Sequence, residues 1–112
     1  MHKPLRYEVL EQAVSIIERC RPLVDAIQRK DRDLASQVRR AASSVVLNIA
    51  EAFGNAGGNA RLRFETARGS LYEAQAGIRT AVAWGYFTAE QSAELLVAME
   101  ALGGRIYGLS RR

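Results

Sequence analysis

Cysteine and histidine are almost absent from this sequence, and each absence removes a class of chemistry. Cys20 is the only cysteine, so neither an intramolecular disulfide nor a thiolate metal site can form. We expect Cys20 to pack as a small apolar residue in a protein of the reducing cytoplasm. His2 is the only histidine and stands near an end that we expect to be frayed. This position argues against histidine acid–base catalysis and against histidine metal clusters.

Long apolar runs are missing as well. No stretch approaches the roughly 18 apolar residues of a membrane span, and the opening residues MHKPLRYEVLEQ contain no apolar signal-peptide core. We therefore expect a soluble, cytoplasmic protein with no membrane contact. Hydrophobic residues make up 48% of the chain and charged residues 25%, which is typical of globular proteins and not of disordered ones. The 112 residues suit one domain, over residues 1–112, with one core.

The common catalytic and cofactor motifs are also lacking. The sequence has no P-loop, no paired-glycine nucleotide fingerprint and no nucleophile elbow. The glycine-rich stretch 54–58 lacks the lysine and the preceding strand of a phosphate cradle, which favours a turn between helices. Glu51, Glu65 and Glu73 lack the histidines three positions later that a di-metal site in a bundle requires. We predict that the protein is not an enzyme and holds neither a cofactor nor a metal.

What the sequence does contain is a helical period in four segments separated by short stretches of turn residues. We expect the first helix to start near Pro4, the second to span about 32–53 and the third about 59–84. The fourth follows a capping box made by Thr88 and Gln91. Connections this short make consecutive helices antiparallel, which predicts an all-α, antiparallel up-down-up-down four-helix bundle. The expected core positions are Val9, Ala13, Ile16, Cys20, Leu23, Ile27, Leu34, Val38, Ala41, Val45, Ile49, Phe64, Ala67, Leu71, Ala74, Ile78, Ala81, Leu95, Met99, Leu102, Ile106 and Leu109.

Three features of these helices carry further expectations. Pro22 interrupts the hydrogen bonding of the first helix but not its apolar rhythm, which predicts a kink or the start of a new helical turn. Gly69 and Gly77 lie inside the third helix, and we expect Gly69 to make a close contact with the stretch 41–45 of the second. The first helix also carries a second apolar row, which indicates either a subunit interface or a broader core. This row is Leu10, Val14, Ile17 and Val24.

The second and third helices should form an antiparallel hairpin with its turn centred near residue 56. A residue of one helix then lies level with the residue of the other whose number, added to its own, gives about 112. Glu73 is then level with Arg39 and Arg40, Arg68 with Ser44, and Arg61 with Glu51. These matches favour inter-helix pairing that fixes the register over an active site. We expect polar neighbours to hold Arg68 inside the bundle, so that its loss costs stability.

The charge is skewed toward arginine. Of the 16 basic residues, all except Lys3 and Lys30 are arginines, and the formal net charge is +4. Arginine presents a planar fork of donors that suits phosphate, although surface solubility with internal ion pairs explains the same composition equally well. The basic residues with few expected internal partners fall at the two ends of the bundle. Arg29, Lys30 and Arg32 line the first connection. Arg61 and Arg63 flank the glycine turn at the opposite end, and Arg111 and Arg112 finish the chain.

Two motifs on the second and third helices resemble those of a known family. The first runs from Arg40 to Ser44 and continues with Asn48-Ile49-Ala50-Glu51, and the second is the stretch 67–73, ARGSLYE. This double motif is similar to that of the four-helix bundle proteins associated with intervening sequences in 23S ribosomal RNA genes. Ala52 replaces the usual motif glycine, and the loop 55–59 lacks the basic and serine residues common there. The matching motif residues are Arg40, Ser44, Asn48, Glu51, Arg68, Gly69, Ser70 and Glu73.

The resemblance implies a ring-shaped homopentamer and a structural role for the motif residues. It also connects the chain to accessory proteins of diversity-generating retroelements, which bind nucleic acid and a reverse transcriptase. Our leading hypothesis is a non-catalytic homo-oligomer that binds RNA or DNA through arginine-rich rims. No aromatic platform is visible in the sequence, so we expect no sequence-specific reading. The alternative is a protein–protein scaffold that engages a partner through an apolar helix surface.

Overall fold

The computed structural model describes residues 5–54 and 58–112, with side chains from residue 7 onward. The expectations for His2, the start at Pro4 and the loop residues 55–57 lie outside these ranges. Within them the chain forms four helices, α1 (Leu5–Gln28), α2 (Arg32–Gly54), α3 (Ala60–Trp84) and α4 (Ala89–Ser110). The bounds of α2 and α3 lie within one residue of the expected ones, which is the precision that capping signals allow.

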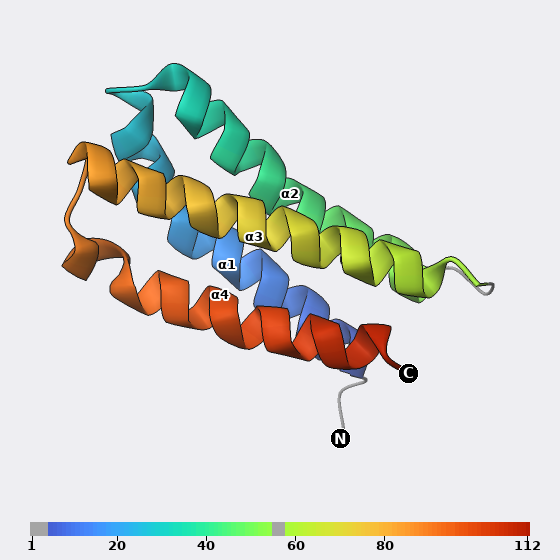
Figure 1. Ribbon diagram of the computed structural model, residues 1–112. Helices are drawn as coiled ribbons and strands as arrows, with labels where there is room; N and C mark the ends of the chain where they lie inside the picture. Colours follow the sequence, from blue (N-terminus) through green and yellow to red (C-terminus); the bar gives the residue numbers. More distant parts are fainter. Residues whose placement is uncertain (1–4, 55–57) are drawn as a thin grey trace.

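The helices alternate in direction, and each packs on its neighbours in the chain (Figure 1). The interface of α2 with α3 is the most extensive, while α1 and α4 close the bundle with the smallest one. Both connections that the structure fully describes, α1 to α2 and α3 to α4, lie at one end, and α4 finishes at the other (Figure 1). This arrangement confirms the all-α, up-down-up-down four-helix bundle. None of the helices in the described part is long and apolar enough to cross a membrane.

The core consists of the apolar stripes that the sequence indicates. Every expected core residue is buried except Leu34, which is half-buried against the core. Large aliphatic side chains fill the centre, and each removes enough apolar surface from water to contribute about 1.5–3 kcal/mol. Those with the least exposure are Ile27, Ile49, Leu71, Ile78, Met99, Leu102 and Ile106.

The junction between α3 and α4 shows how local residues set the helix ends. Gly85 has a φ of +82°, and its N–H donates to the carbonyl of Val82 while that of Tyr86 donates to Ala81. This left-handed cap satisfies the last carbonyls of α3 and suits glycine, which has no β-carbon to clash. Thr88 Oγ1 then accepts from the N–H of Gln91 at 3.1 Å, and the Gln91 side chain accepts from Thr88 N–H at 2.7 Å. The predicted capping box is confirmed.

The remaining expectations for the helices have mixed outcomes. Helix α1 continues through Pro22, which is exposed, so the hydrogen bond that proline cannot make is lost on the solvent side. In the second apolar row, Val24 is buried and Leu10 and Ile17 pack partly buried against the core. Val14 alone in that row is 43% exposed. Most of the row therefore belongs to a broadened core, and not to a free surface.

The expectation for Gly69 is wrong. Gly69 is exposed, and a β-carbon built there would meet no atom within 4 Å. The close approach occurs at Gly77, where a β-carbon would overlap the Cγ2 methyl of Val38 and also touch Leu34. Residue 77 adjoins Ile78 on the buried face of α3, whereas residue 69 has rotated out of that face because successive helical residues turn by about 100°.

Candidate nucleic-acid interface

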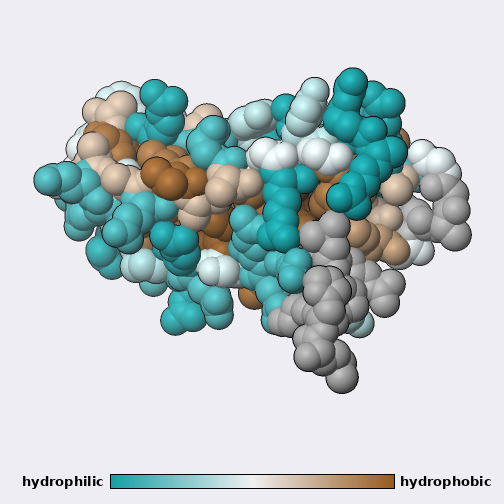
Figure 2. All heavy atoms as spheres, turned by 90° about the horizontal axis from the view of Figure 1, so that it is seen from below, coloured by the Kyte–Doolittle hydropathy of each residue, from teal (hydrophilic) through white to brown (hydrophobic). Residues whose placement is uncertain are grey.

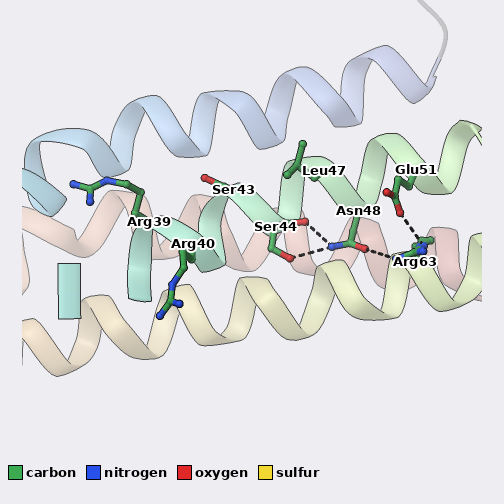
Figure 3. A pocket seen from close by; sticks show the side chains of 8 residues that line it. All are labelled: Arg39, Arg40, Ser43, Ser44, Leu47, Asn48, Glu51 and Arg63. Carbon is green, nitrogen blue, oxygen red and sulfur yellow. Dashed lines mark hydrogen bonds and ion pairs between the residues drawn. The ribbon is translucent and has the colours of Figure 1, made fainter. Parts of the chain in front are cut away.

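A hollow of about 580 Å³ follows the exposed side of α2 where α3 begins to cover it (Figure 3). Arg39 and Arg40 line one end of it (Figure 3). Both side chains are exposed, and within residues 5–54 and 58–112 neither makes an ion pair or a hydrogen bond. The other lining residues are Ser43, Ser44, Leu47, Asn48, Glu51 and Arg63.

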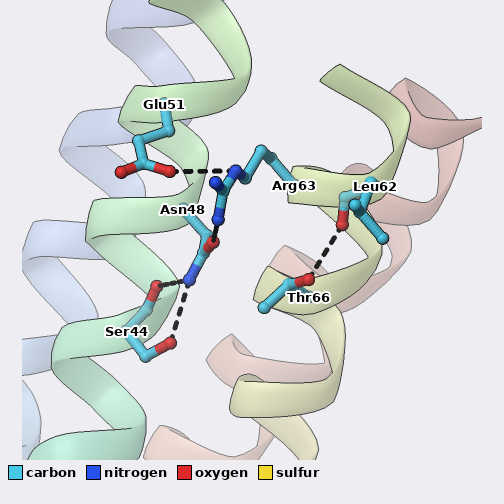
Figure 4. Close-up of polar contacts among 6 residues, drawn as sticks. All are labelled: Ser44, Asn48, Glu51, Leu62, Arg63 and Thr66. Atoms are coloured by element: carbon cyan, nitrogen blue, oxygen red, sulfur yellow. Dashed lines mark hydrogen bonds and ion pairs between the residues drawn. The ribbon is translucent and has the colours of Figure 1, made fainter. Parts of the chain in front are cut away.

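A ladder of polar contacts connects lining residues at the other end of this hollow (Figure 4). Asn48 Nδ2 donates to the carbonyl of Ser44 at 2.9 Å and to its Oγ at 3.0 Å. Asn48 Oδ1 accepts a long hydrogen bond of 3.5 Å from Arg63 Nη1. Arg63 Nε lies 2.9 Å from Glu51 Oε2, an ion-pair distance at which the N–H is not aligned as in a hydrogen bond. The side chains of Asn48, Glu51 and Arg63 are therefore engaged by internal partners, whereas those of Arg39 and Arg40 are not.

Ser44 and Ser70 connect this ladder to α3, because their hydroxyl oxygens lie 2.8 Å apart. The pairs Ser44 with Ser70 and Glu51 with Arg63 show that level positions sum to 114, two residues beyond the predicted register. The cause is the position of the turn. Helix α2 ends at Gly54 and α3 begins at Ala60, so the hairpin is centred on 57 and not on 56.

This shift overturns three predicted pairs. Arg61 does not meet Glu51 but approaches Glu65 one helical turn further on, at 3.9 Å. Arg63 takes the place of Arg61 at Glu51, so it is not the unpartnered rim residue that we predicted. Glu73 is exposed and forms no ion pair with Arg39 or Arg40 in the part of the chain that the structure describes.

Arg68 also departs from its prediction. It does not reach Ser44, and instead points toward α4, where its guanidinium carbon lies 4.7 Å from the centroid of the Tyr107 ring. Its Nη2 donates to the hydroxyl of Tyr72 at 3.2 Å. The reason is again helix rotation: Ser70 faces α2, and residues two positions before it lie about 160° away around the helix. No carboxylate pairs with Arg68 among the described residues.

The predicted rim residues lie at opposite ends of the bundle, as expected. Arg29, Lys30 and Arg32 are exposed at the end where α1 meets α2, and none of them has an ion-pair partner within the described ranges. Arg61 is the second residue of α3, which begins at the other end of the bundle, and the exposed Arg111 and Arg112 follow α4, which finishes at that same end (Figure 1). Arg111 approaches the Tyr107 ring, with 5.7 Å between its guanidinium carbon and the ring centroid.

Sequence reasoning missed Ser43 as a lining residue and assigned both Arg39 and Arg40 to internal pairing with Glu73. The signal was present, since two adjacent arginines followed by Ser43 and Ser44 place cations and hydroxyls one turn apart on a single helix. Other chemistry is limited. Among the described residues, no group of three or more histidine, cysteine or acidic side chains could hold a metal. Burial raises the pKa of the Cys20 thiol to about 11, with a smaller opposing effect of Arg19, so Cys20 is inert.

The double motif on α2 and α3 lies within a stretch that matches a family model. Residues 6–108 fit the model of the 23S rRNA-intervening sequence protein, which is most of the chain. The chain belongs to this family. The outcome confirms the resemblance read from the motif residues, of which Ser44, Asn48, Glu51 and Ser70 meet in the polar ladder. No curated protein is detectably similar to this sequence.

A solved structure supports the fold assignment. The chain is similar to a protein of unknown function from the S23 ribosomal protein family of Bacteroides thetaiotaomicron, with a TM-score of 0.84. The similarity covers 93% of this chain and 99% of that one at 15% sequence identity. At this identity the likeness establishes a shared bundle and leaves function to the surface residues of this chain.

Proposed function

We propose that this member of the 23S rRNA-intervening sequence protein family is a non-catalytic protein that binds RNA or DNA through the phosphate backbone. The observation that carries the proposal is the pair Arg39 and Arg40, two exposed guanidinium groups with no internal ion pair that line the same hollow as the hydroxyl of Ser43. Guanidinium forks and hydroxyl donors are the groups that proteins use to hold phosphate. The exposed basic residues at the two ends of the bundle add to the positive charge of the protein.

The composition of the hollow favours binding over catalysis. Its one carboxylate, Glu51, is engaged by Arg63, and its amide, Asn48, is engaged by Ser44 and Arg63. A proton-transfer site would need a free base or acid within reach of a substrate. The residues left over are the two arginines, the hydroxyl of Ser43 and the apolar wall of Leu47, which is 64% exposed.

We further propose that the protein acts in the cytoplasm as a homo-oligomer, in keeping with the ring-shaped pentamer implied by the family resemblance. A ring joins two unlike patches on each subunit, and this chain exposes apolar side chains on separate faces. Leu47 and Leu62 lie on α2 and α3, while Val97 on α4 is 70% exposed beside an apolar groove between α1 and α4. Figure 2 shows hydrophobic surface exposed among hydrophilic side chains on one face of the molecule. Five copies would carry a charge of about +20, which strengthens attraction to phosphate.

The test is a salt titration of binding to labelled RNA and DNA oligonucleotides. Neutralising the pair with Arg39→Gln and Arg40→Gln should flatten the dependence of log K on log salt by roughly one unit for each phosphate that the variant no longer binds. A matched control, Arg79→Gln with Arg105→Gln, removes the same charge from exposed sites away from the hollow and should leave the slope nearly unchanged. An equal decrease of slope in both double variants would replace a defined interface with diffuse attraction.

The same measurements examine the scaffold alternative, which the apolar groove between α1 and α4 favours. If the wild-type protein binds no nucleic acid even at low salt, the groove becomes the better candidate surface. Light scattering should give several times the 12.4 kDa monomer mass. Val97→Glu would lower that mass if the groove contacts a second copy, and would leave it unchanged if the groove receives a different protein.

A further inference from the structure

Arginine and tyrosine side chains alternate in a cluster on the side of the bundle formed by α3 and α4. Arg68 and Tyr72 are one turn apart on α3, while Tyr107 lies in the last turn of α4 and Arg111 directly follows that helix. The guanidinium carbon of Arg68 lies 4.7 Å from the Tyr107 ring centroid and 5.5 Å from that of Tyr72. We call these four residues the tyrosine–arginine cluster. It was not visible in the sequence, because 35 positions separate its two tyrosines.

The cluster borders a hollow of about 290 Å³. Gly103 and Gly104 of α4 form part of its lining, and they leave this space open because they have no side chains. A β-carbon at Gly103 would touch Leu71 of the core at 3.4 Å, whereas one at Gly104 would meet no atom within 4 Å. The hollow is therefore shallow toward the core and open toward solvent, with aromatic and cationic walls.

The groups around this hollow are only partly used by the protein itself. Tyr72 is 49% exposed and Tyr107 46% exposed, so both rings present surface to solvent. Neither Arg68 nor Arg111 has an ion-pair partner among the described residues. The Nε atom of Arg68 is buried and makes no hydrogen bond, although a buried donor without an acceptor is costly. An additional acceptor near Arg68 would remove this cost.

We infer that the tyrosine–arginine cluster is a stacking site for an unpaired nucleobase, an inference that rests on the proposed nucleic-acid function. Aromatic rings and guanidinium planes are the surfaces on which proteins stack single-stranded bases, and the carbonyl oxygens and ring nitrogens of a base supply acceptors for arginine. Glu100 also lines the hollow, where it accepts a long hydrogen bond from Gln75. Its negative charge disfavours phosphate inside the hollow, in contrast to the cationic hollow at Arg39 and Arg40.

The two hollows lie on opposite sides of α3. Ser70 contacts Ser44 on the α2 side. Arg68, two positions earlier, lies over the Tyr107 ring of α4, and Tyr72, two positions later, lines the same hollow as Tyr107. A helix with its side chains is about 10–12 Å across, a width that a strand of a few nucleotides can cross. One strand would thus place phosphates at Arg39 and Arg40 and a base in the cluster. A duplex, with its bases stacked and paired, could not do so.

The test compares two short single-stranded RNA oligonucleotides with the same number of phosphates, one with bases and one with abasic sites at its central positions. The wild-type protein should bind the intact strand about tenfold more tightly, in line with the contribution of one stacked base. Tyr72→Leu with Tyr107→Leu should abolish this difference and keep the salt slope. Tyr72→Phe with Tyr107→Phe keeps the rings and should retain the difference. Trp84→Leu, which removes an aromatic ring that is 69% exposed at the far end of α3, is the matched control.

A second variant separates loss of the site from loss of folding. Gly104→Leu fills the hollow at a position where the structure has free space, and replacing a helical glycine should raise the melting temperature. It should nevertheless lower the preference for the intact strand. Equal binding of intact and abasic strands by the wild-type protein, with a steep salt slope, would overturn the stacking site and leave phosphate binding in place. No binding of either strand at low salt would overturn both proposals.

Discussion

Gly77 of α3 lies directly against Val38 of α2, so closely that a β-carbon on residue 77 would overlap the Cγ2 methyl of Val38. Both residues are buried, and Val38 is branched at Cβ and therefore has few alternative rotamers. The contact brings the two backbones together within the largest helix interface of the bundle. A helix interior normally disfavours glycine by about 1 kcal/mol, and this close approach explains why glycine is present at 77.

We predict that Gly77→Ala destabilises the protein by about 1–3 kcal/mol through overpacking, despite its better helix propensity. Gly69→Ala is the matched control on the same helix, and it should stabilise by about 0.5–1 kcal/mol because its surroundings are open. Urea denaturation of the two variants measures both values. If Gly77→Ala were as stable as Gly69→Ala, the close contact with Val38 would be contradicted.

Breaking the ion pair between Glu51 and Arg63 should strengthen the binding of nucleic acid. Glu51→Gln removes the carboxylate beside Arg63 and should raise affinity for an oligonucleotide several-fold at low salt, because the freed guanidinium adds to the positive hollow. Both side chains are about half exposed, so the free energy of unfolding should fall by less than about 1 kcal/mol. Fluorescence anisotropy and thermal melting give the two numbers. Glu18→Gln, at an exposed carboxylate of α1 with no ion-pair partner among the described residues, is the control for net charge alone.

Arg68 should contribute less to stability than its place in the family motif indicates. Arg68→Ala leaves no buried carboxylate behind and removes one hydrogen bond and two cation–π contacts at a half-exposed site. We expect a loss of about 1–2 kcal/mol in the free energy of unfolding, not the roughly 3 kcal/mol or more that follows from breaking a buried ion pair. Chemical denaturation beside Arg79→Ala, whose side chain is exposed, provides the comparison. A loss well above about 3 kcal/mol would restore a structural role.

Cys20 predicts a specific dependence of stability on pH. Burial raises the pKa of this thiol from 9.0 to about 11 in the folded protein, so the folded state holds its proton more tightly than the unfolded state. The resulting stability is fully present below pH 9 and is lost as the pH rises toward 11. The wild-type protein should therefore lose about 2–3 kcal/mol more than Cys20→Ala over this range, by the linkage of pKa to free energy. Urea denaturation at several pH values measures the free energy of unfolding of both proteins. If it changed with pH equally in the wild type and in Cys20→Ala, the burial of this thiol would be contradicted.

The positions of the helices and their buried faces could be predicted because they depend on local signals. The heptad spacing of Leu95, Met99 and Leu102 defines the buried side of α4, and Gly85 and Thr88 mark where one helix stops and the next begins. The family could be recognised for a similar reason, since its motifs lie on two consecutive helices whose pairing follows from a short connection. The predicted turn was centred on residue 56 and the observed one on 57, and this difference of one residue shifted every predicted pair between α2 and α3 by two positions.

The sequence by itself determined the four helices, their antiparallel order, the apolar stripes and the excess of arginine. Only the tertiary structure decided which arginines are engaged and which are free. Arg63 and Arg40 differ because of a two-residue register, and Arg68 faces Tyr107 because of the rotation of α3 about its axis. Helix periodicity is a property of neighbouring residues, whereas register and rotation result from packing all four helices at once. The polar ladder and the tyrosine–arginine cluster therefore arise from contacts between residues far apart in the chain.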